Sequence, residues 1–299
     1  MIKTNVAGSA LSVKERVELL NNLAAGVATT MVPGTARTTL QYTISLTRIW
    51  EQLLEEIAPR PDELTLDIGC GFGLVNLEIG IRFDAPCVGC DIVPELIDGA
   101  RVIEGHLRSL GAISSKATTM FGRGDICNLP YGDSSFEVVI VREVLQYLPD
   151  PSVAIREIFR VLKPGGRVII EDLEDALYIV EPPNPASFSF LHDAISRLQK
   201  MKGGNRNVGR QIAPLLYKGG FEVTKVSTLS EGDFVDESSA SFERAFVIEQ
   251  LMSAKSELIE SGVVTGEQFE ENINDLKSQP YNPQFRMNGR IAVQARKPS

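Results

Sequence analysis

The chain has 299 residues, 43% of them hydrophobic, which is enough to bury one full α/β core and an accessory segment. The 30 basic and 39 acidic residues give a formal net charge of −9, and this disfavours binding to the phosphate backbone of a nucleic acid. No stretch approaches 18 uninterrupted apolar residues, and no basic start precedes an apolar run at the N-terminus, so we expect neither a membrane span nor a secretory signal.

Apolar residues recur at helical spacing through the first part of the chain, and Pro59 and Pro61 end this pattern. We therefore predict an N-terminal helical cap over residues 1–60 and a second domain over residues 61–299. In this domain short apolar runs alternate with helical patterns, and the predicted strands are 64–68, 87–92, 117–121, 136–141, 167–171, 221–229 and 290–296. Such alternation predicts an α/β fold, a Rossmann-like doubly wound and mostly parallel seven-stranded sheet with helices on both faces.

Two segments of this domain do not fit the alternation of strand and helix. A helical insertion is predicted between the last two strands, roughly over residues 239–278, and connections this long usually have a function such as covering a site. We assign substrate-binding or lid roles to residues of about 174–205 and 230–285. The aromatic residues of these segments are consistent with an apolar or aromatic substrate pocket and equally with a satellite core: Phe188, Phe190, Phe234, Phe242 and Phe246.

The spacing Cys87-x-x-Cys90 raises the question of a metal or redox site. The pair lies in a predicted strand, where residues three apart point to opposite faces, and no second such pair or nearby His completes a site. We therefore predict no metal site and a reduced protein.

A glycine-rich turn directly follows the first predicted strand, with Gly69, Gly71 and Gly73 ahead of a helix. Glycines at such a place permit a tight turn and a close approach of the backbone to a ligand. The pattern differs from the G-x-G-x-x-G of dinucleotide sites, because the third position is Leu74. Asp67, just before the turn, would repel a pyrophosphate and would suit a ligand with a cationic amino group.

Acidic residues also follow the next two predicted strands. Asp91 can accept hydrogen bonds from both hydroxyls of a ribose, or it can cap the helix that begins near Pro94. Asp125 can hold an exocyclic amine while Ile126 packs on a purine ring, or it can be a turn aspartate. Because three such signals stand in order at the ends of successive strands, a shared ligand explains them better than three separate coincidences.

In these motifs the chain resembles class I S-adenosylmethionine (SAM)-dependent methyltransferases, specifically the UbiE-like branch that acts on small molecules. The resemblance is strong over about residues 64–171 and weaker over 205–226 and the last strand. It is carried by residues 66–73, Asp91, Asp125 with Ile126, the segment 141–150, and the segment 160–166.

The resemblance implies which residues bind SAM. Asp67 and the three glycines would contact its methionine part, Asp91 the ribose, and Ile92, Asp125 and Ile126 the adenine. Val141 and Arg142 would line the sulfonium side, and Gln146 would face the same pocket. Members of the family often carry His near Gln146 and Tyr147, and this chain does not, so a base at that position is in doubt.

The implied reaction is an in-line displacement that moves the methyl group to an O, N or C nucleophile and releases S-adenosylhomocysteine. Proximity and orientation account for much of such catalysis, and a base is needed only if the nucleophile holds a proton. His192 lies where the substrate should sit and is a candidate base, with Tyr178, Glu174 and Asp175 as rivals. We expect His106 to be exposed on a helix.

The function we predict is methylation of a small, apolar or aromatic metabolite, plausibly in specialised-metabolite biosynthesis and in the cytoplasm. The alternatives are an enzyme of the same fold that catalyses a step such as cyclisation, and a catalytically silent binding partner. A nicotinamide dehydrogenase is disfavoured by Asp67 and Leu74. The sequence leaves the oligomeric state open, a homodimer included.

Overall fold

The computed structural model describes residues 53–109, 111, 113, 118–280 and 282–299. The predicted helical cap therefore lies outside the described residues except at its end, where residues 53–57 are helical. From there strands and helices alternate in the predicted order. The elements are β1 (Thr65–Ile68), α4 (Leu74–Phe83), β2 (Cys87–Asp91), α5 (Pro94–Ser109), β3 (Thr119–Arg123), β4 (Phe136–Arg142), α6 (Pro151–Val161), β5 (Leu162–Leu173), β6 (Ile179–Glu181), α7 (Ala186–Met201), α8 (Ile212–Lys218), β7 (Glu222–Val235), α9 (Glu237–Glu260), α10 (Gly266–Ser278) and β8 (Gln284–Arg296).

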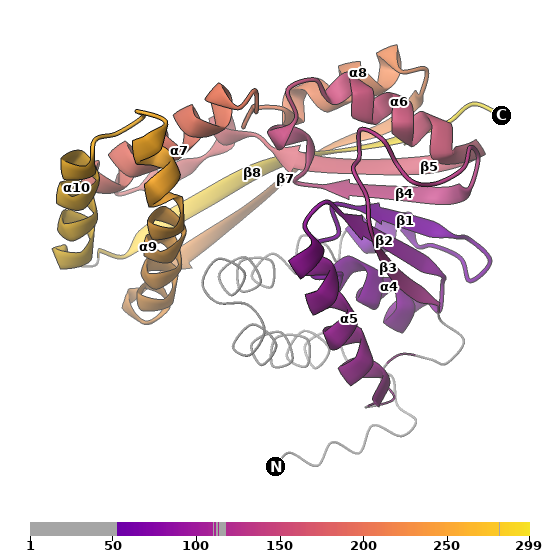
Figure 1. The fold of residues 1–299 in the computed structure, drawn as a ribbon, viewed down its shortest axis with the longest axis horizontal. Helices are drawn as coiled ribbons and strands as arrows, with labels where there is room; N and C mark the ends of the chain where they lie inside the picture. Colours follow the sequence, from indigo (N-terminus) through magenta and orange to yellow (C-terminus); the bar gives the residue numbers. More distant parts are fainter. Residues whose placement is uncertain (1–52, 110, 112, 114–117, 281) are drawn as a thin grey trace.

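The strands form one sheet in the order β3-β2-β1-β4-β5-β8-β6, and β7 pairs with β8. The five strands from β3 to β5 are parallel, and β8 runs antiparallel to its three neighbours. The chain thus forms the predicted Rossmann-like, mostly parallel sheet, and the carboxyl ends of β1, β2 and β4 meet at one edge (Figure 1).

Two apolar clusters cover the two faces of this sheet. One joins the sheet to residues 53–57, α4 and α5, and the other joins it to α6 and α8. Cys87 belongs to the first cluster and Cys90 to the second, so the two thiols do lie on opposite faces. All four cysteines of the chain are unpaired, and the described residues contain no group of side chains suited to hold a metal ion.

The structure differs from the prediction in the outer strands. All seven predicted strands are present, and β6 is an additional one. β7 and β8 are also longer than predicted, because they pair with each other beyond the edge of the main sheet. β6 forms only by pairing with this extension of β8, a tertiary contact that three residues of local sequence do not reveal.

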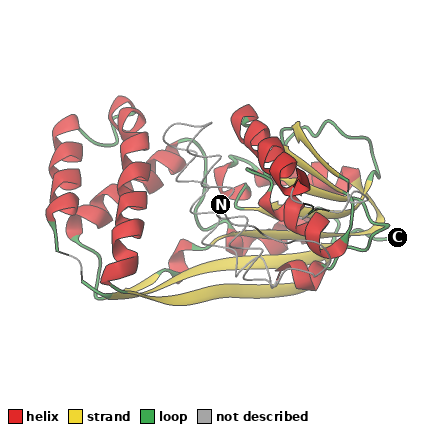
Figure 2. Ribbon diagram, turned by 90° about the horizontal axis from the view of Figure 1, so that it is seen from below, coloured by secondary structure: helices red, strands yellow, loops and turns green. Residues whose placement is uncertain are grey.

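The extended hairpin of β7 and β8 leads to a lobe of α7, α9 and α10, which the two views place at one end of the molecule (Figures 1 and 2). Leu191, Leu258 and Phe269 are fully buried in the lobe, and Phe188 and Phe190 pack against this third cluster. The satellite-core interpretation is therefore correct for these two aromatic residues. The side chain of Phe234 is exposed, and those of Phe242 and Phe246 lie outside what the structure describes.

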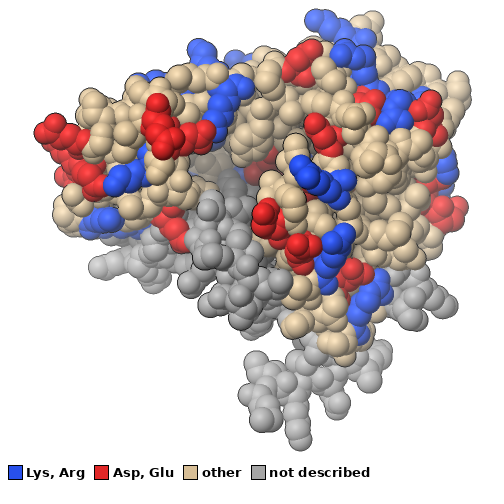
Figure 3. All heavy atoms as spheres, viewed as in Figure 1, with Lys and Arg blue, Asp and Glu red and all other residues tan. Residues whose placement is uncertain are grey.

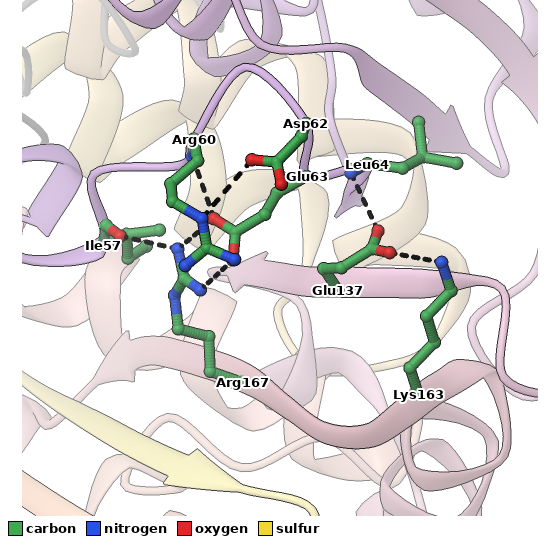
Figure 4. A network of polar contacts seen from close by, with 8 residues as sticks. All are labelled: Ile57, Arg60, Asp62, Glu63, Leu64, Glu137, Lys163 and Arg167. Atoms are coloured by element: carbon green, nitrogen blue, oxygen red, sulfur yellow. Dashed lines mark hydrogen bonds and ion pairs between the residues drawn. The ribbon is translucent and has the colours of Figure 1, made fainter.

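An ion pair links Glu63, just before β1, to β5, and a hydrogen bond from the Leu64 N–H to Glu137 links the same segment to β4 (Figure 4). Arg167 of β5 donates two hydrogen bonds to the buried carboxylate of Glu63, at 2.6 and 2.7 Å, and one to the carbonyl of Ile57 at 3.0 Å. Burial, the largest single effect, would raise the pKa of Glu63, but the hydrogen bonds from Arg167 and from the Arg60 N–H and the charges of both arginines together outweigh it, so the pKa lies below its ordinary value. On one face of the molecule, acidic and basic side chains are interspersed (Figure 3).

Candidate functional site

The turn between β1 and α4 has the open backbone that a ligand needs. Gly69, Gly71 and Gly73 have φ values of 71°, 54° and 71°, which favour glycine. A Cβ atom added at Gly69 would lie 2.2 Å from Val144 Cγ2, and one at Gly73 would lie 2.3 Å from Phe121 Cε1. A Cβ atom at Gly71 would meet no atom of the described residues within 4 Å. Packing therefore fills two of the three positions, and the third faces open space.

Asp91 lies beside this open position. The end of β2 buries its carboxylate, whose Oδ2 accepts a hydrogen bond from the Gly71 N–H at 2.9 Å. Oδ1 accepts from the Val93 N–H at 3.0 Å, so the side chain holds the residue just before α5 and contacts the approach to the helix, although this bond does not cap its first turn. Each carboxylate oxygen has a second lone pair with which it can accept a ligand hydroxyl. The contact with Val93 is thus compatible with a role of Asp91 toward a ribose.

Asp67 is a second buried carboxylate near the glycine turn. With the Asn76 amide turned so that its nitrogen faces the carboxylate, Nδ2 donates to Asp67 Oδ2 at 2.7 Å and the amide oxygen accepts from the Gly89 N–H at 2.9 Å. Burial raises the pKa of Asp67 to about 7, with a smaller contribution from Asp91, while the charge of Arg142 opposes the rise. The carboxyl therefore titrates close to neutral pH and is poised to ionise when a cation arrives.

The predicted adenine-binding residues have unequal exposure. Ile92 is 56% exposed next to Asp91 and offers an apolar surface to a flat ring. Ile126 is 5% exposed and packs in the core on the side of α6 and α8, so its side chain has little surface left for a ring. Asp125 is exposed, but its Oδ1 accepts from the Cys127 N–H at 2.8 Å, as in the turn interpretation. Of the two apolar side chains, Ile92 is the better platform.

The residues after β4 form a network of buried charges. Val141 is fully buried in the core, whereas the Arg142 side chain donates from Nε to Glu171 Oε2 at 2.6 Å. Arg290 of β8 donates from Nε to Glu143 Oε1 at 2.7 Å and lies 3.1 Å from Glu171 Oε1. Alternating charges thus link β4, β5 and β8 at the edge of the sheet that carries the candidate site.

Asp172 and Gln146 connect this network to the short helical turn 145–147. The buried Asp172 carboxylate accepts a hydrogen bond from the Gln146 N–H at 3.2 Å, and burial raises the pKa of Asp172 to about 8, with help from the charge of Glu143. Gln146 is buried, and its backbone carbonyl and its Oε1 accept from Gln199 Nε2 of α7 at 2.9 and 3.2 Å. Gln146 therefore joins the sheet to the helical lobe.

His192 lies on α7 between two aromatic rings. The ring of Phe188 is stacked at 5.8 Å between centroids and that of Tyr178 at 6.4 Å, and this stacking leaves the in-plane nitrogens of the imidazole able to exchange a proton. Burial lowers the pKa of His192, the nearby Arg206 lowers it further, and the carboxylates of Asp175 and Asp193 oppose this. The imidazole is therefore neutral at neutral pH and is able to accept a proton.

The rival bases are less suited to the task. Glu174 is buried, and its two oxygens accept hydrogen bonds from the backbone N–H and the side-chain Nε of Arg210 at 3.0 and 2.9 Å. Asp175 receives two hydrogen bonds from Arg206, at 2.5 and 3.2 Å. Both carboxylates thus hold arginines in place. Tyr178, the third rival, stacks on His192, and its hydroxyl accepts a hydrogen bond from Asn184 Nδ2 at 2.9 Å. His106 is exposed on α5, as predicted.

Three residues of this network, Glu143, Asp172 and Arg290, carry no role in the sequence-based prediction. Glu143 was only part of a recognised segment, and Asp172 followed a strand without a motif of its own. Arg290 is the first residue of the strand predicted over 290–296, where a charge is ordinary, so the sequence carries no signal that its side chain is buried.

Residues 66–170 match a family model described as a methyltransferase domain. The match covers about a third of the chain, and it supports the predicted likeness to SAM-dependent methyltransferases in that part. The glycine turn, Asp91 and the segment after β4 all lie inside this domain, whereas α7, α9, α10 and Arg290 lie outside it. The narrower UbiE-like branch remains a prediction.

Several known proteins are similar to the domain and its surroundings. The O-methyltransferase cnsE of Penicillium expansum is 27% identical over 184 residues, which are 62% of this chain and 61% of that protein. The ajmaline N-methyltransferase of Rauvolfia serpentina is 31% identical over 143 residues, 46% of this chain and 47% of that protein. The crystal structure of the 4+2 cyclase SpnF covers 98% of both chains with a TM-score of 0.54, and at 20% identity this likeness shows the fold alone.

The chain thus spans 47% and 61% of the two curated relatives, so their activities do not transfer to it as a whole. Among the described residues, no helix is both long and apolar enough to cross a membrane.

Proposed function

We propose that the protein is an enzyme that transfers a methyl group from SAM to a small organic molecule and releases S-adenosylhomocysteine. The observation that carries this proposal is the open space at Gly71 beside the buried Asp91 carboxylate, within a methyltransferase domain. When bound, SAM supplies an activated methyl group on a positively charged sulfur.

The residues at this edge of the sheet fit the chemical parts of that cofactor. The spare lone pairs of Asp91 suit ribose hydroxyls, and the exposed Ile92 suits a flat base. Asp67 titrates near neutral pH and favours a cationic amino group when ionised. Asp125, Ile126, Val141 and Arg142 stay predictions as further contacts.

The protein's contribution to the reaction is to bind, to orient and to exclude water. Holding two reactants in line replaces an encounter in solution, an effect worth roughly 7–11 kcal/mol in favourable cases. We assign the cover over the reacting groups to the lobe of α7, α9 and α10, because Gln199 ties α7 to Gln146 after β4. If the nucleophile holds a proton, the neutral His192 accepts it through the edge of its ring.

Several features support a small-molecule substrate. The relatives named above are described as O- and N-methyltransferases, one of them acting on the small molecule ajmaline. The net charge of −9 disfavours a nucleic acid. The four unpaired cysteines suit a reducing compartment such as the cytoplasm.

The test is to incubate the protein with SAM and a panel of aromatic alcohols and amines, and to follow S-adenosylhomocysteine together with product mass. We expect equimolar S-adenosylhomocysteine and a product heavier by one methyl group. Consumption of a compound to an isomer of unchanged mass, without S-adenosylhomocysteine, would instead show a step such as cyclisation. If the protein neither turns over any compound nor binds SAM, the alternative of a catalytically silent binding partner is favoured.

The role of His192 is tested by His192→Asn, with His106→Asn on the exposed face of α5 as the matched control. Removal of a general base typically lowers kcat by about 100-fold or more, and the control should not change it. Equal kcat for both variants would mean that His192 takes no proton.

A further inference from the structure

Glu143 has an unusual backbone conformation at the edge of the candidate site. It directly follows β4 with a φ of +52°, a left-handed conformation that side chains other than Asn and Asp rarely adopt. Three other described residues that are not glycine share a positive φ, and Asp84 and Ser134 among them lie at a helix end and in a surface turn. Backbone strain at a binding site persists only when the surroundings hold it.

The conformation of Glu143 determines where the following residues lie. Val144 packs directly on the glycine turn, since its Cγ2 lies 2.2 Å from the Cβ position of Gly69. Two residues further on, the Gln146 N–H donates to Asp172. The left-handed residue therefore bends the chain out of β4 and onto the turn that faces the candidate cofactor.

Two strands hold Glu143 in this conformation. Its backbone N–H donates to the carbonyl of Glu171 in β5 at 2.9 Å. Its side chain accepts from Nε of Arg290 in β8 at 2.7 Å, and Arg290 is only 1% exposed. Burial works against ionisation of Glu143, but the charge of Arg290, followed by those of Arg142 and Arg206, keeps its pKa below the ordinary value.

Stability alone is a weak explanation for a buried ion pair, because apolar side chains of similar volume often stabilise the fold equally well. An ion pair that fixes one strained residue can instead serve to define local geometry. We propose that Arg290 and Glu143 are positioning residues for the cofactor: the pair holds Glu143 left-handed, so that Val144 presses against Gly69 and keeps the glycine turn in its binding shape. This inference rests on the proposed function.

The experiment compares variants by calorimetric affinity for S-adenosylhomocysteine and by Tm. Glu143→Gly keeps the left-handed conformation accessible but removes the ion pair, and Ser134→Gly is the matched control for the same backbone change far from the site. We expect Glu143→Gly to bind at least about tenfold more weakly at a temperature where it is fully folded, although its Tm should fall below that of the control, because the buried Arg290 loses one carboxylate partner and keeps Glu171. Glu143→Gln, which keeps the shape and an acceptor for Arg290, should lose only about threefold.

A second part of the experiment uses Arg290→Lys, which keeps a buried positive charge but removes the guanidinium Nε that donates to Glu143. We expect a loss of about tenfold, and a combined loss for Arg290→Lys with Glu143→Gly that is clearly smaller than the sum of the two, because both variants remove the pair between Arg290 and Glu143 while Arg290→Lys also alters the contact with Glu171. Affinities within twofold of wild type, additive losses, or failure of both single variants to fold would overturn the positioning role. If the wild-type protein itself does not bind S-adenosylhomocysteine, it is the proposed function that fails.

Discussion

Gly71→Ala is the sharpest test of the open position in the glycine turn. Gly71 has a φ of +54°, and no atom in the described part of the chain lies within 4 Å of an added Cβ, so the cost to folding that we expect is that of a left-handed alanine. That cost is about 1–2 kcal/mol, which lowers the Tm of a chain this long by about 2–4 °C per kcal/mol. Gly262 in the turn between α9 and α10 has a φ of +71° and equally open surroundings, so Gly262→Ala should cost a similar amount.

The two variants should differ only in ligand binding. The added methyl group lies in the space through which the cofactor is proposed to approach the backbone of Gly71. We therefore expect affinity for S-adenosylhomocysteine to fall at least about tenfold, or 1.4 kcal/mol. Gly262→Ala should bind like wild type. Calorimetric titration of both proteins checks this, and equal affinities for Gly71→Ala and Gly262→Ala would refute the placement of the ligand.

Three other outcomes follow from the charges. Because the pKa of Asp67 is raised from 3.8 to about 7, its contribution to stability is fully present below about pH 4 and is lost as the pH rises through 7. Asp67→Asn should therefore flatten the fall in Tm between pH 5 and 8, and an unchanged slope would contradict the assigned pKa. Arg167→Met removes two hydrogen bonds from the buried Glu63 carboxylate and leaves it Arg60, so it should reduce the free energy of unfolding by up to about 3 kcal/mol in urea titrations. The double variant Glu63→Gln, Arg167→Met should recover part of that loss, and additive losses would argue against the pair. Because the pKa of Glu63 lies below its ordinary value, the stability that Glu63 contributes should be present above about pH 4.5 and decline as the pH falls further, and this decline should vanish in Glu63→Gln.

The central sheet could be predicted from the sequence because its signals are local. A strand buried on both faces, such as β4, is an apolar run, and the turn after β1 needs glycines for its backbone. The order of acidic residues after successive strands then predicts a shared site, since parallel strands end at one edge. Asp91 shows the limit of this reasoning, because its carboxylate accepts from the backbone of both the glycine turn and Val93, a double contact that the sequence does not reveal, while its role toward a ribose stays a prediction.

The outer part of the molecule depends on contacts between residues far apart in the sequence. β6 exists only through β8, and Arg290 meets Glu143 across 147 positions of the chain. Glu174 is a plausible base in sequence terms, but the fold brings Arg210 to both of its oxygens. No local pattern encodes such partners, so the ion pairs around the site could not be predicted.

The account is tested most directly by titrating S-adenosylhomocysteine into the purified wild-type protein and its Asp91→Ala variant in a calorimeter. We expect saturable binding of one ligand per chain by the wild type. The variant should bind at least about tenfold more weakly, since it loses the acceptor for ribose hydroxyls and for the Gly71 N–H. A folded wild-type protein with no affinity for this ligand, or a variant that binds equally well, would contradict the central claim.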